Sequence, residues 1–223
     1  MKEKNYSTEI ANAIKSYLKE DNWHFSFNEE SGLLKFGLSL SSKIKKINYI
    51  VDVKEDEYIV YAIAPIGADE EDKKMMATMA EFVCRANYGL KNGNFELDMR
   101  DGEVRFKCFV DCEGITPSKD MVQNSIHCPA AMFKRYSSGI VDIIFGNATA
   151  KEAVEKCEKA TEDEIRSLLS ELTEGEDEGE LGEILAKLAE RLGSPDDDDE
   201  SCDTGCVSAM IKTDLFGTEG DDD

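Results

Sequence analysis

Four residues in the middle of the chain carry side chains of the kinds that bind metal ions or react as thiols: Cys108, Cys112, His127 and Cys128. Zinc takes four ligands of these types. The spacing differs from that of a zinc knuckle, because Cys108 and Cys112 on one extended strand would point to the same face about 13 Å apart. A metal- or thiol-dependent protein that uses these four residues is therefore the alternative hypothesis.

The other candidate residues favour a role that involves neither catalysis nor metal binding. Cys202 and Cys206 lie in an acidic segment that contains no histidine, so incidental or redox-labile thiols are expected there. His24 falls on the polar side of a predicted strand, where a surface histidine is expected. The sequence contains no glycine-rich phosphate loop and no G-x-S-x-G motif. We therefore predict no catalytic residue, no cofactor and no metal ligand.

The elements that must position these residues are predicted from the spacing of apolar side chains, which has a period of two in strands and of three to four in helices. Predicted helices cover 10–18, 75–86, 118–145 and 149–157, and predicted strands cover 23–28, 34–40, 47–53, 57–64, 95–100 and 103–108. Pro129 lies inside the third helix and is expected to kink it. Strands in runs, interrupted by single helices, predict an α+β fold with an antiparallel β-sheet flanked by helices.

The two strands at 95–108 predict a β-hairpin with a two-residue turn at Asp101-Gly102. This turn sets the cross-strand pairs Met99–Val104, Leu97–Phe106 and Phe95–Cys108 on an apolar side, and Arg100–Glu103, Asp98–Arg105 and Glu96–Lys107 on a polar side. A slip of one residue would move every apolar side chain into water. The pattern therefore also predicts that one face of the sheet is solvated.

The charge of the chain is concentrated near its C-terminus. Residues 1–158 hold 21 basic and 26 acidic residues, a net of −5, whereas residues 159–223 hold 5 basic and 22 acidic, a net of −17. This balance argues against nucleic-acid partners and anionic membrane surfaces. The chain has no long apolar run, and its seven cysteines fit no disulfide framework. We therefore expect a soluble cytoplasmic protein with reduced thiols.

The change in composition also predicts three parts of the chain. Residues 1–158 form the main domain, and residues 159–193 carry leucine-rich stripes at helical spacing, which predict acidic amphipathic helices. Residues 194–223 contain two runs of acidic residues and are expected to be a disordered tail.

Over residues 8–158 the chain resembles the YbjN family, described as bacterial sensory transduction regulators. The resemblance is carried by the Gly89-Leu90 helix end, the strand from Gly93 to Asp98, the Asp101-Gly102 turn and the Gly114-Ile-Thr-Pro117 segment that opens a long helix. The family is similar in fold to class I chaperones of type III secretion, which have a twisted antiparallel sheet flanked by helices, are usually homodimers and bind an extended segment of a partner. The resemblance implies no catalytic residue.

The leading hypothesis is therefore a non-enzymatic protein-binding module. It would act as a chaperone-like protein or a regulatory adaptor on another, unidentified polypeptide, and it would form a homodimer through helix and sheet-edge contacts.

Overall fold

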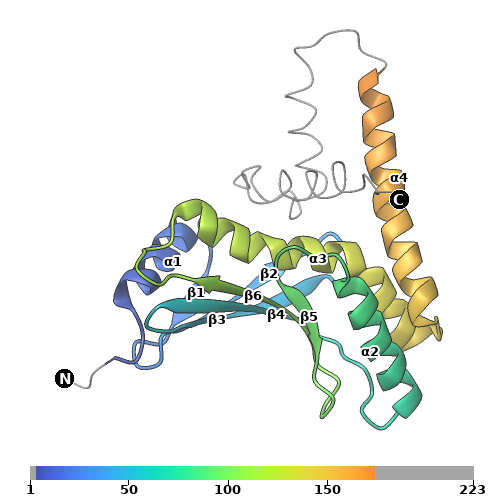
Figure 1. Cartoon of the computed structure of the whole chain (residues 1–223), viewed down its shortest axis with the longest axis horizontal. Helices are drawn as coiled ribbons and strands as arrows, with labels where there is room; N and C mark the ends of the chain where they lie inside the picture. The colour runs from blue at the N-terminus through green and yellow to red at the C-terminus, as the bar shows by residue number, and fades with distance from the viewer. Residues whose placement is uncertain (1–3, 174–223) are drawn as a thin grey trace, which may run out of the picture.

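A computed structural model describes residues 4–173 of the chain (Figure 1). Its elements follow in the order α1 (Thr8–Glu20), β1 (Phe25–Phe27), β2 (Leu33–Ser39), β3 (Lys46–Val53), β4 (Glu57–Ile63), α2 (Lys73–Asn87), β5 (Asn94–Leu97), β6 (Val104–Asp111), α3 (Lys119–Gly146) and α4 (Ala150–Thr173). The predicted order of helices and strands is confirmed as far as α4.

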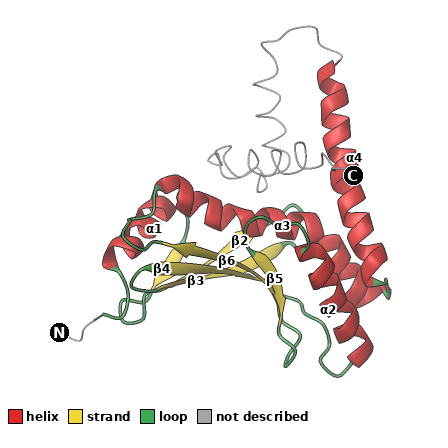
Figure 2. Cartoon of the chain, in the orientation of Figure 1, coloured by secondary structure: helices red, strands yellow, loops and turns green. Residues whose placement is uncertain are grey.

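The strands form one six-stranded sheet in the spatial order β1-β2-β3-β4-β6-β5, and every neighbouring pair is antiparallel. The predicted α+β class is thus confirmed. Figure 2 shows α1 and α3 above the sheet, with α2 beside its β5 end and α4 beyond α3. None of the described helices lies beneath the sheet.

The core lies between α3 and the covered face of the sheet. Two rows of buried side chains cross the strands on this face: Leu34, Val51, Val60 and Cys108 in one row, and Phe36, Tyr49, Ala62, Phe106 and Phe95 in the other. Two tyrosine hydroxyls tie α3 to the sheet. Tyr49 donates to the backbone oxygen of Ile126 at 2.7 Å, and Tyr58 lies 3.1 Å from the Ser125 hydroxyl. Buried hydroxyls are thereby satisfied at the main helix–sheet contact.

Short polar side chains cap three of the described helices. Ser7, Asp72 and Ser118 each accept hydrogen bonds from backbone N–H groups in the first turn of the helix that follows. The third helix remains one continuous element through Pro129. The fourth is longer than predicted, since it passes Cys157 and continues to Thr173.

The predicted hairpin register is wrong by two residues. Phe95 pairs with Phe106 rather than Cys108, and Leu97 pairs with Val104. β5 ends at Leu97 and β6 begins at Val104, so residues 98–103 form a longer loop than predicted and Met99 is exposed. A slip of two keeps every side chain on its predicted face, which is why the apolar pattern did not exclude it.

The remaining C-terminal predictions lie outside the described residues. These are the second leucine-rich stripe at 181–192, the acidic tail at 194–223, and Cys202 with Cys206.

Candidate functional site

The four candidate metal or thiol residues do not converge. Cys108 on β6 lies beside Cys128 on α3, and the Cys128 thiol donates to the Asn92 backbone oxygen at 3.6 Å. The thiol of Cys112 instead points back toward the Val110 backbone oxygen at 3.9 Å. His127 faces α1 on another side of α3. Within residues 4–173 no group of three or more cysteine, histidine, aspartate or glutamate side chains is placed to hold a metal ion.

The surroundings of Cys128 favour a neutral thiol. The neighbouring Cys108 thiol, followed by burial, raises the pKa of Cys128 far above its ordinary value. Burial also raises the pKa of Cys112. Because the thiolate is the nucleophile, these environments make the thiols weak nucleophiles at neutral pH.

His127 joins two helices inside the protein. Its Nε2 lies 2.7 Å from the Tyr17 hydroxyl of α1, and the Trp23 ring packs edge-on against the imidazole at 6.0 Å. Burial lowers the pKa of His127, although the charge of Asp21 opposes this shift. A neutral imidazole that makes a buried hydrogen bond is a structural feature, which holds α1 against α3.

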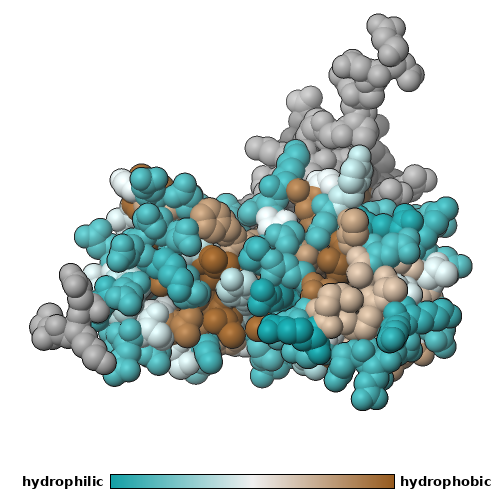
Figure 3. Space-filling view, turned by 60° about the horizontal axis from the view of Figure 1, so that its bottom comes forward, coloured by the Kyte–Doolittle hydropathy of each residue, from teal (hydrophilic) through white to brown (hydrophobic). Residues whose placement is uncertain are grey.

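The described helices leave the face of the sheet opposite α3 uncovered (Figure 2). Five apolar side chains form a band across its three central strands: Ile50 on β3, Ile59, Tyr61 and Ile63 on β4, and Phe109 on β6. They are only partly buried, and Phe109 is 51% exposed. Figure 3, turned to bring the underside forward, shows hydrophobic side chains gathered between hydrophilic ones. We call this set the apolar band.

Charged side chains border the apolar band on both sides. On the β5 side, Glu96 accepts hydrogen bonds from Arg105 at 2.8 Å and Lys107 at 2.5 Å. Burial raises the pKa of Glu96, but these two cations outweigh it and lower the pKa overall. Arg105 also stacks over the Tyr61 ring at 4.5 Å. On the β2 side the exposed Lys35 pairs with Ile50.

The two edges of the sheet differ in whether they can accept another strand. At the β5 edge, the Asn87 side chain from α2 accepts from the Phe95 N–H at 2.7 Å and donates to the Phe95 oxygen at 2.9 Å. It therefore occupies the backbone groups that an added strand would use. The opposite edge, β1, is three residues long. We expected sheet-edge pairing from the sequence, but few backbone groups at either edge are available to pair with an added strand.

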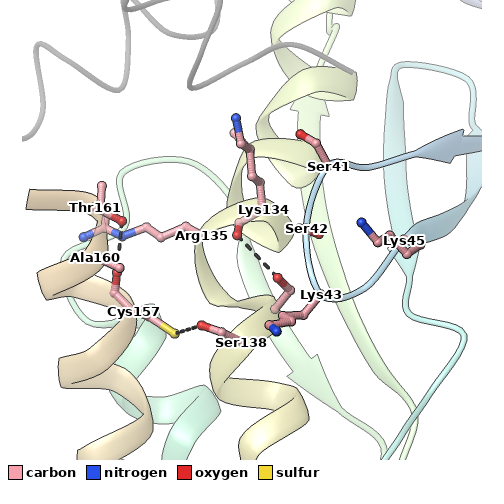
Figure 4. A pocket seen from close by; sticks show the side chains of 12 residues that line it. Ser41, Ser42, Lys43, Lys45, Lys134, Arg135, Ser138, Cys157, Ala160 and Thr161 are labelled. Atoms are coloured by element: carbon pink, nitrogen blue, oxygen red, sulfur yellow. Dashed lines mark hydrogen bonds between the residues drawn. The ribbon is translucent and has the colours of Figure 1, made fainter. Parts of the chain in front are cut away.

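A cavity of about 560 Å³ lies between the β2–β3 loop, α3 and α4 (Figure 4). The described residues that line it are Ser41, Ser42, Lys43, Lys45, Ala131, Lys134, Arg135, Ser137, Ser138, Cys157, Ala160 and Thr161. Four of these described residues are basic. Cys157 lies at its base, with its thiol 3.2 Å from the Ser138 hydroxyl.

Sequence reasoning missed both the apolar band and the cavity. The signal for the band is the run Tyr58–Ala64, which is apolar at every position and so lacks the alternation of a strand with one wet face. The signal for the cavity is the cluster Lys43–Lys46 in a chain with 26 basic and 48 acidic residues.

Among the helices of the described part of the chain, none has both the length and the apolar composition needed to cross a bilayer. No family model matches the sequence, and no curated protein is similar enough to count as a match.

Proposed function

We propose that this chain is a non-enzymatic protein-binding module that acts on another polypeptide, as a chaperone-like protein or a regulatory adaptor, and that it works as a homodimer. The observation that carries the proposal is the apolar band on the uncovered face of the sheet. The resemblance to the YbjN family, noted from the sequence, agrees with this role.

The apolar band is suited to a second copy of the same chain. The six strands lie about 4.8 Å apart and are three to eight residues long, so that together they give a flat face of about 600 Å². The pleated, side-chain-covered surface is larger, and a standard interface buries about 800 Å² on each partner. A face of this size with an apolar centre and a charged border has the anatomy of a protein interface.

A two-fold arrangement can bring two such bands together. A two-fold axis parallel to the strands lays the band of one copy on the band of the other. It also places the β2 border of one copy, which carries Lys35, over the β5 border of its partner, where Glu96 is paired with Arg105 and Lys107. We therefore propose face-to-face pairing in place of edge-to-edge pairing.

The free energy that the band contributes to dimerisation can be estimated from Phe109. A phenylalanine carries about 200 Å² of surface, so the 51% that Phe109 exposes is about 100 Å². Burying this area contributes about 2.5 kcal/mol in each copy at about 25 cal/mol per Å². Because both copies contribute, replacing Phe109 in the two chains weakens dimerisation by about 5 kcal/mol, or roughly 10³- to 10⁴-fold.

The test is the association state of the full chain and of Phe109→Lys by sedimentation equilibrium. We expect a dimer that becomes a monomer on substitution. Phe145→Lys is the matched control, because Phe145 is 71% exposed at the end of α3, away from the sheet. The control should remain a dimer. A monomeric wild-type chain, or equal dimerisation of both variants, would contradict the proposed interface.

Action on another polypeptide needs its own experiment. Cross-linking and mass spectrometry of the natively purified chain should return a polypeptide that is then purified and recombined with it. We expect a fixed stoichiometry with the wild-type dimer and at least tenfold weaker binding by the Phe109→Lys monomer. Failure to reconstitute the complex from purified components would count against the adaptor role.

The alternative hypothesis, a metal- or thiol-dependent protein, has less support. Of Cys108, Cys112, His127 and Cys128, only Cys108 and Cys128 lie side by side, and the surroundings of Cys128 favour the neutral thiol. Elemental analysis of the reduced protein tests it, since a stoichiometric metal would revive this hypothesis.

A further inference from the structure

The side chains on the uncovered face of the sheet form rows that cross the central strands β3, β4 and β6. The strand register gives the three rows as Asp52, Ile59 and Phe109; then Ile50, Tyr61 and Lys107; then Asn48, Ile63 and Arg105. A carboxylate, that of Asp52, lies in the first row, whereas an amide and a guanidinium, those of Asn48 and Arg105, lie in the third. The face therefore differs in chemistry between its two ends along the strand direction.

Face-to-face pairing of two copies allows two directions for the two-fold axis. An axis parallel to the strands lays β3 of one copy over β6 of the other and keeps each row opposite itself. An axis that runs across the strands, between the two sheets, lays each strand antiparallel over its own copy and sets the first row opposite the third. Both directions lay band on band, but they bring different side chains together.

The axis parallel to the strands matches the side chains poorly. It sets Asp52 of one copy opposite Phe109 of the other, and Ile50 opposite Lys107. Both contacts press a charged group against an apolar side chain, and burying a charge costs free energy unless a partner compensates it. This direction therefore loses part of what burial of the band contributes.

The axis across the strands matches apolar side chains with one another. Ile50 and Tyr61, in the middle row, then meet their own copies, and Ile59 meets Ile63. The centre of the band is thereby covered by apolar groups on both sides, which is the favourable arrangement for removing apolar surface from water.

The same direction accommodates the charged residues of the face. Phe109 meets Arg105 of the other copy, and Arg105 already stacks over an aromatic ring of its own chain at 4.5 Å. Lys107 comes near its own copy, but Glu96 pairs with it at 2.5 Å and offsets the repulsion. Lys35 also comes near its own copy, yet it is exposed at the border, where its long side chain can turn into water.

The carboxylate of Asp52 gives a separate reason for this direction, because one of its oxygens has no donor. Oδ2 pairs with Lys54 Nζ at 2.8 Å, whereas Oδ1 is buried and accepts no hydrogen bond from the described residues. An unsatisfied buried acceptor is costly. The side chain is 23% exposed overall and its terminal torsion turns readily, so an incoming donor can reach the carboxylate. The axis across the strands supplies that donor, since it sets the exposed Asn48 amide opposite Asp52.

Given the proposed face-to-face dimer, on which this inference rests, we propose that its two-fold axis runs across the strands and that Asp52 of each copy accepts a hydrogen bond from the Asn48 amide of the other. Two-fold symmetry makes this contact twice. Asp52 and Asn48 thereby select a second copy of this chain in one register.

A change of charge at Asn48 distinguishes the two axes by the sign of its effect on dimerisation. With the axis across the strands, Asn48→Asp sets a second carboxylate opposite Asp52 and should weaken dimerisation of the full chain at least tenfold, whereas Asn48→Lys should tighten it at least threefold. With the axis parallel to the strands, Asn48 faces Arg105 and both effects change sign. Sedimentation equilibrium at low salt measures the dissociation constants.

The matched controls are Asn124→Asp and Asn124→Lys, because Asn124 is exposed on α3, on the other side of the sheet. These variants change the net charge of the chain by the same amount. Their dissociation constants should stay within twofold of the wild-type value. Equal effects at Asn48 and Asn124 would mean that net charge alone acts, and would overturn the proposal.

A double-variant comparison tests the hydrogen bond itself. Asn48→Ala and Asp52→Ala each remove one side of the contact and should weaken dimerisation about tenfold. The double variant should be no weaker than the weaker single variant, because both substitutions remove the same contact. Losses that multiply in the double variant would overturn the pairing of these two residues.

The wild-type chain separates failure of this inference from failure of the proposed function. A monomeric wild-type chain contradicts the face-to-face dimer and the axis together. A wild-type dimer that Asn48→Asp tightens, or that neither charged variant of Asn48 changes, overturns the axis across the strands and leaves the face-to-face dimer in place.

Discussion

The turn of the β5–β6 hairpin makes a close backbone contact that should be sensitive to a single methyl group. Gly102 has a φ of +73°, donates its N–H to the Asp98 oxygen at 2.8 Å and accepts from the Ala68 N–H at 3.0 Å. A Cβ atom on Gly102 would lie 1.8 Å from the Ala68 oxygen. Gly102→Ala must therefore move one of two backbone segments.

The expected cost has two main parts. An alanine in the left-handed region costs about 1 to 2 kcal/mol. Moving the loop away from Ala68 weakens the hydrogen bond between the two backbones, and a net contribution of about 1 kcal/mol per bond is typical. Looser packing around the displaced loop adds to these, so we expect Gly102→Ala to lower the free energy of unfolding by about 2 to 4 kcal/mol.

The variant Gly114→Ala separates the cost of backbone strain from the cost of the close contact with Ala68. Gly114 has the same φ of +73°, but a Cβ there would have no neighbouring atom within 4 Å. This variant should lose only the backbone part, about 1 to 2 kcal/mol. Urea denaturation at equilibrium, followed by circular dichroism, measures both variants. Equal destabilisation would refute the reasoning, because the contact with Ala68 would then contribute nothing.

Three further predictions concern titration, reactivity and the sheet edge. Burial raises the pKa of Tyr58 to about 12, so the unfolded chain loses this proton first, and stability should fall by about 1.4 kcal/mol per pH unit between about pH 10 and 12. Denaturation across that pH range should show that the free energy of unfolding falls less steeply in Tyr58→Phe than in the wild type. Parallel curves for the two proteins would contradict this prediction. Maleimide labelling at pH 8 with peptide mapping should modify the exposed Cys84 before the half-buried Cys128, whose pKa is raised. The reverse order of labelling would contradict the low reactivity that we infer for Cys128. Asn87→Ala should free both backbone groups of Phe95 and lower the free energy of unfolding by about 1 to 3 kcal/mol. Hydrogen exchange should then show a less protected Phe95 amide. Unchanged protection would contradict the role of Asn87 at the β5 edge.

Much of the fold follows from local patterns. Ser7, Asp72 and Ser118 mark the starts of helices because their side chains satisfy backbone N–H groups that a helix leaves without partners. The period of two identifies the strands, and the order of elements leads to an antiparallel sheet. These signals depend on residues close together in the chain, and so they can be detected without tertiary structure.

The hairpin shows where local patterns are insufficient. A cross-strand pair contributes only about 0.2 to 1 kcal/mol, and registers two residues apart place the same side chains on the same faces. The choice between them falls to contacts that the hairpin makes elsewhere, such as the packing of Gly102 against Ala68. No pattern within residues 95–108 contains that information.

The candidate thiol site failed for a related reason. Adjacent residues of a helix point about 100° apart, so His127 and Cys128 face different neighbours. Cys128 meets Cys108 on the sheet, whereas His127 meets Tyr17 on α1. Proximity in sequence suggested one cluster, but α3 packs against α1 through His127 and against the sheet through Cys128, so the candidates are divided into two groups.

The residues that share a face of each strand follow from the order of amino acids alone, because side chains alternate along an extended backbone. The same order makes β4 apolar on both faces, through Ile59, Tyr61 and Ile63 as well as Tyr58, Val60 and Ala62. Which face the helices cover is visible only in the folded chain, since it depends on the packing of segments far apart in the sequence. The described helices leave the second apolar face of β4 uncovered, and the proposed function depends on that face.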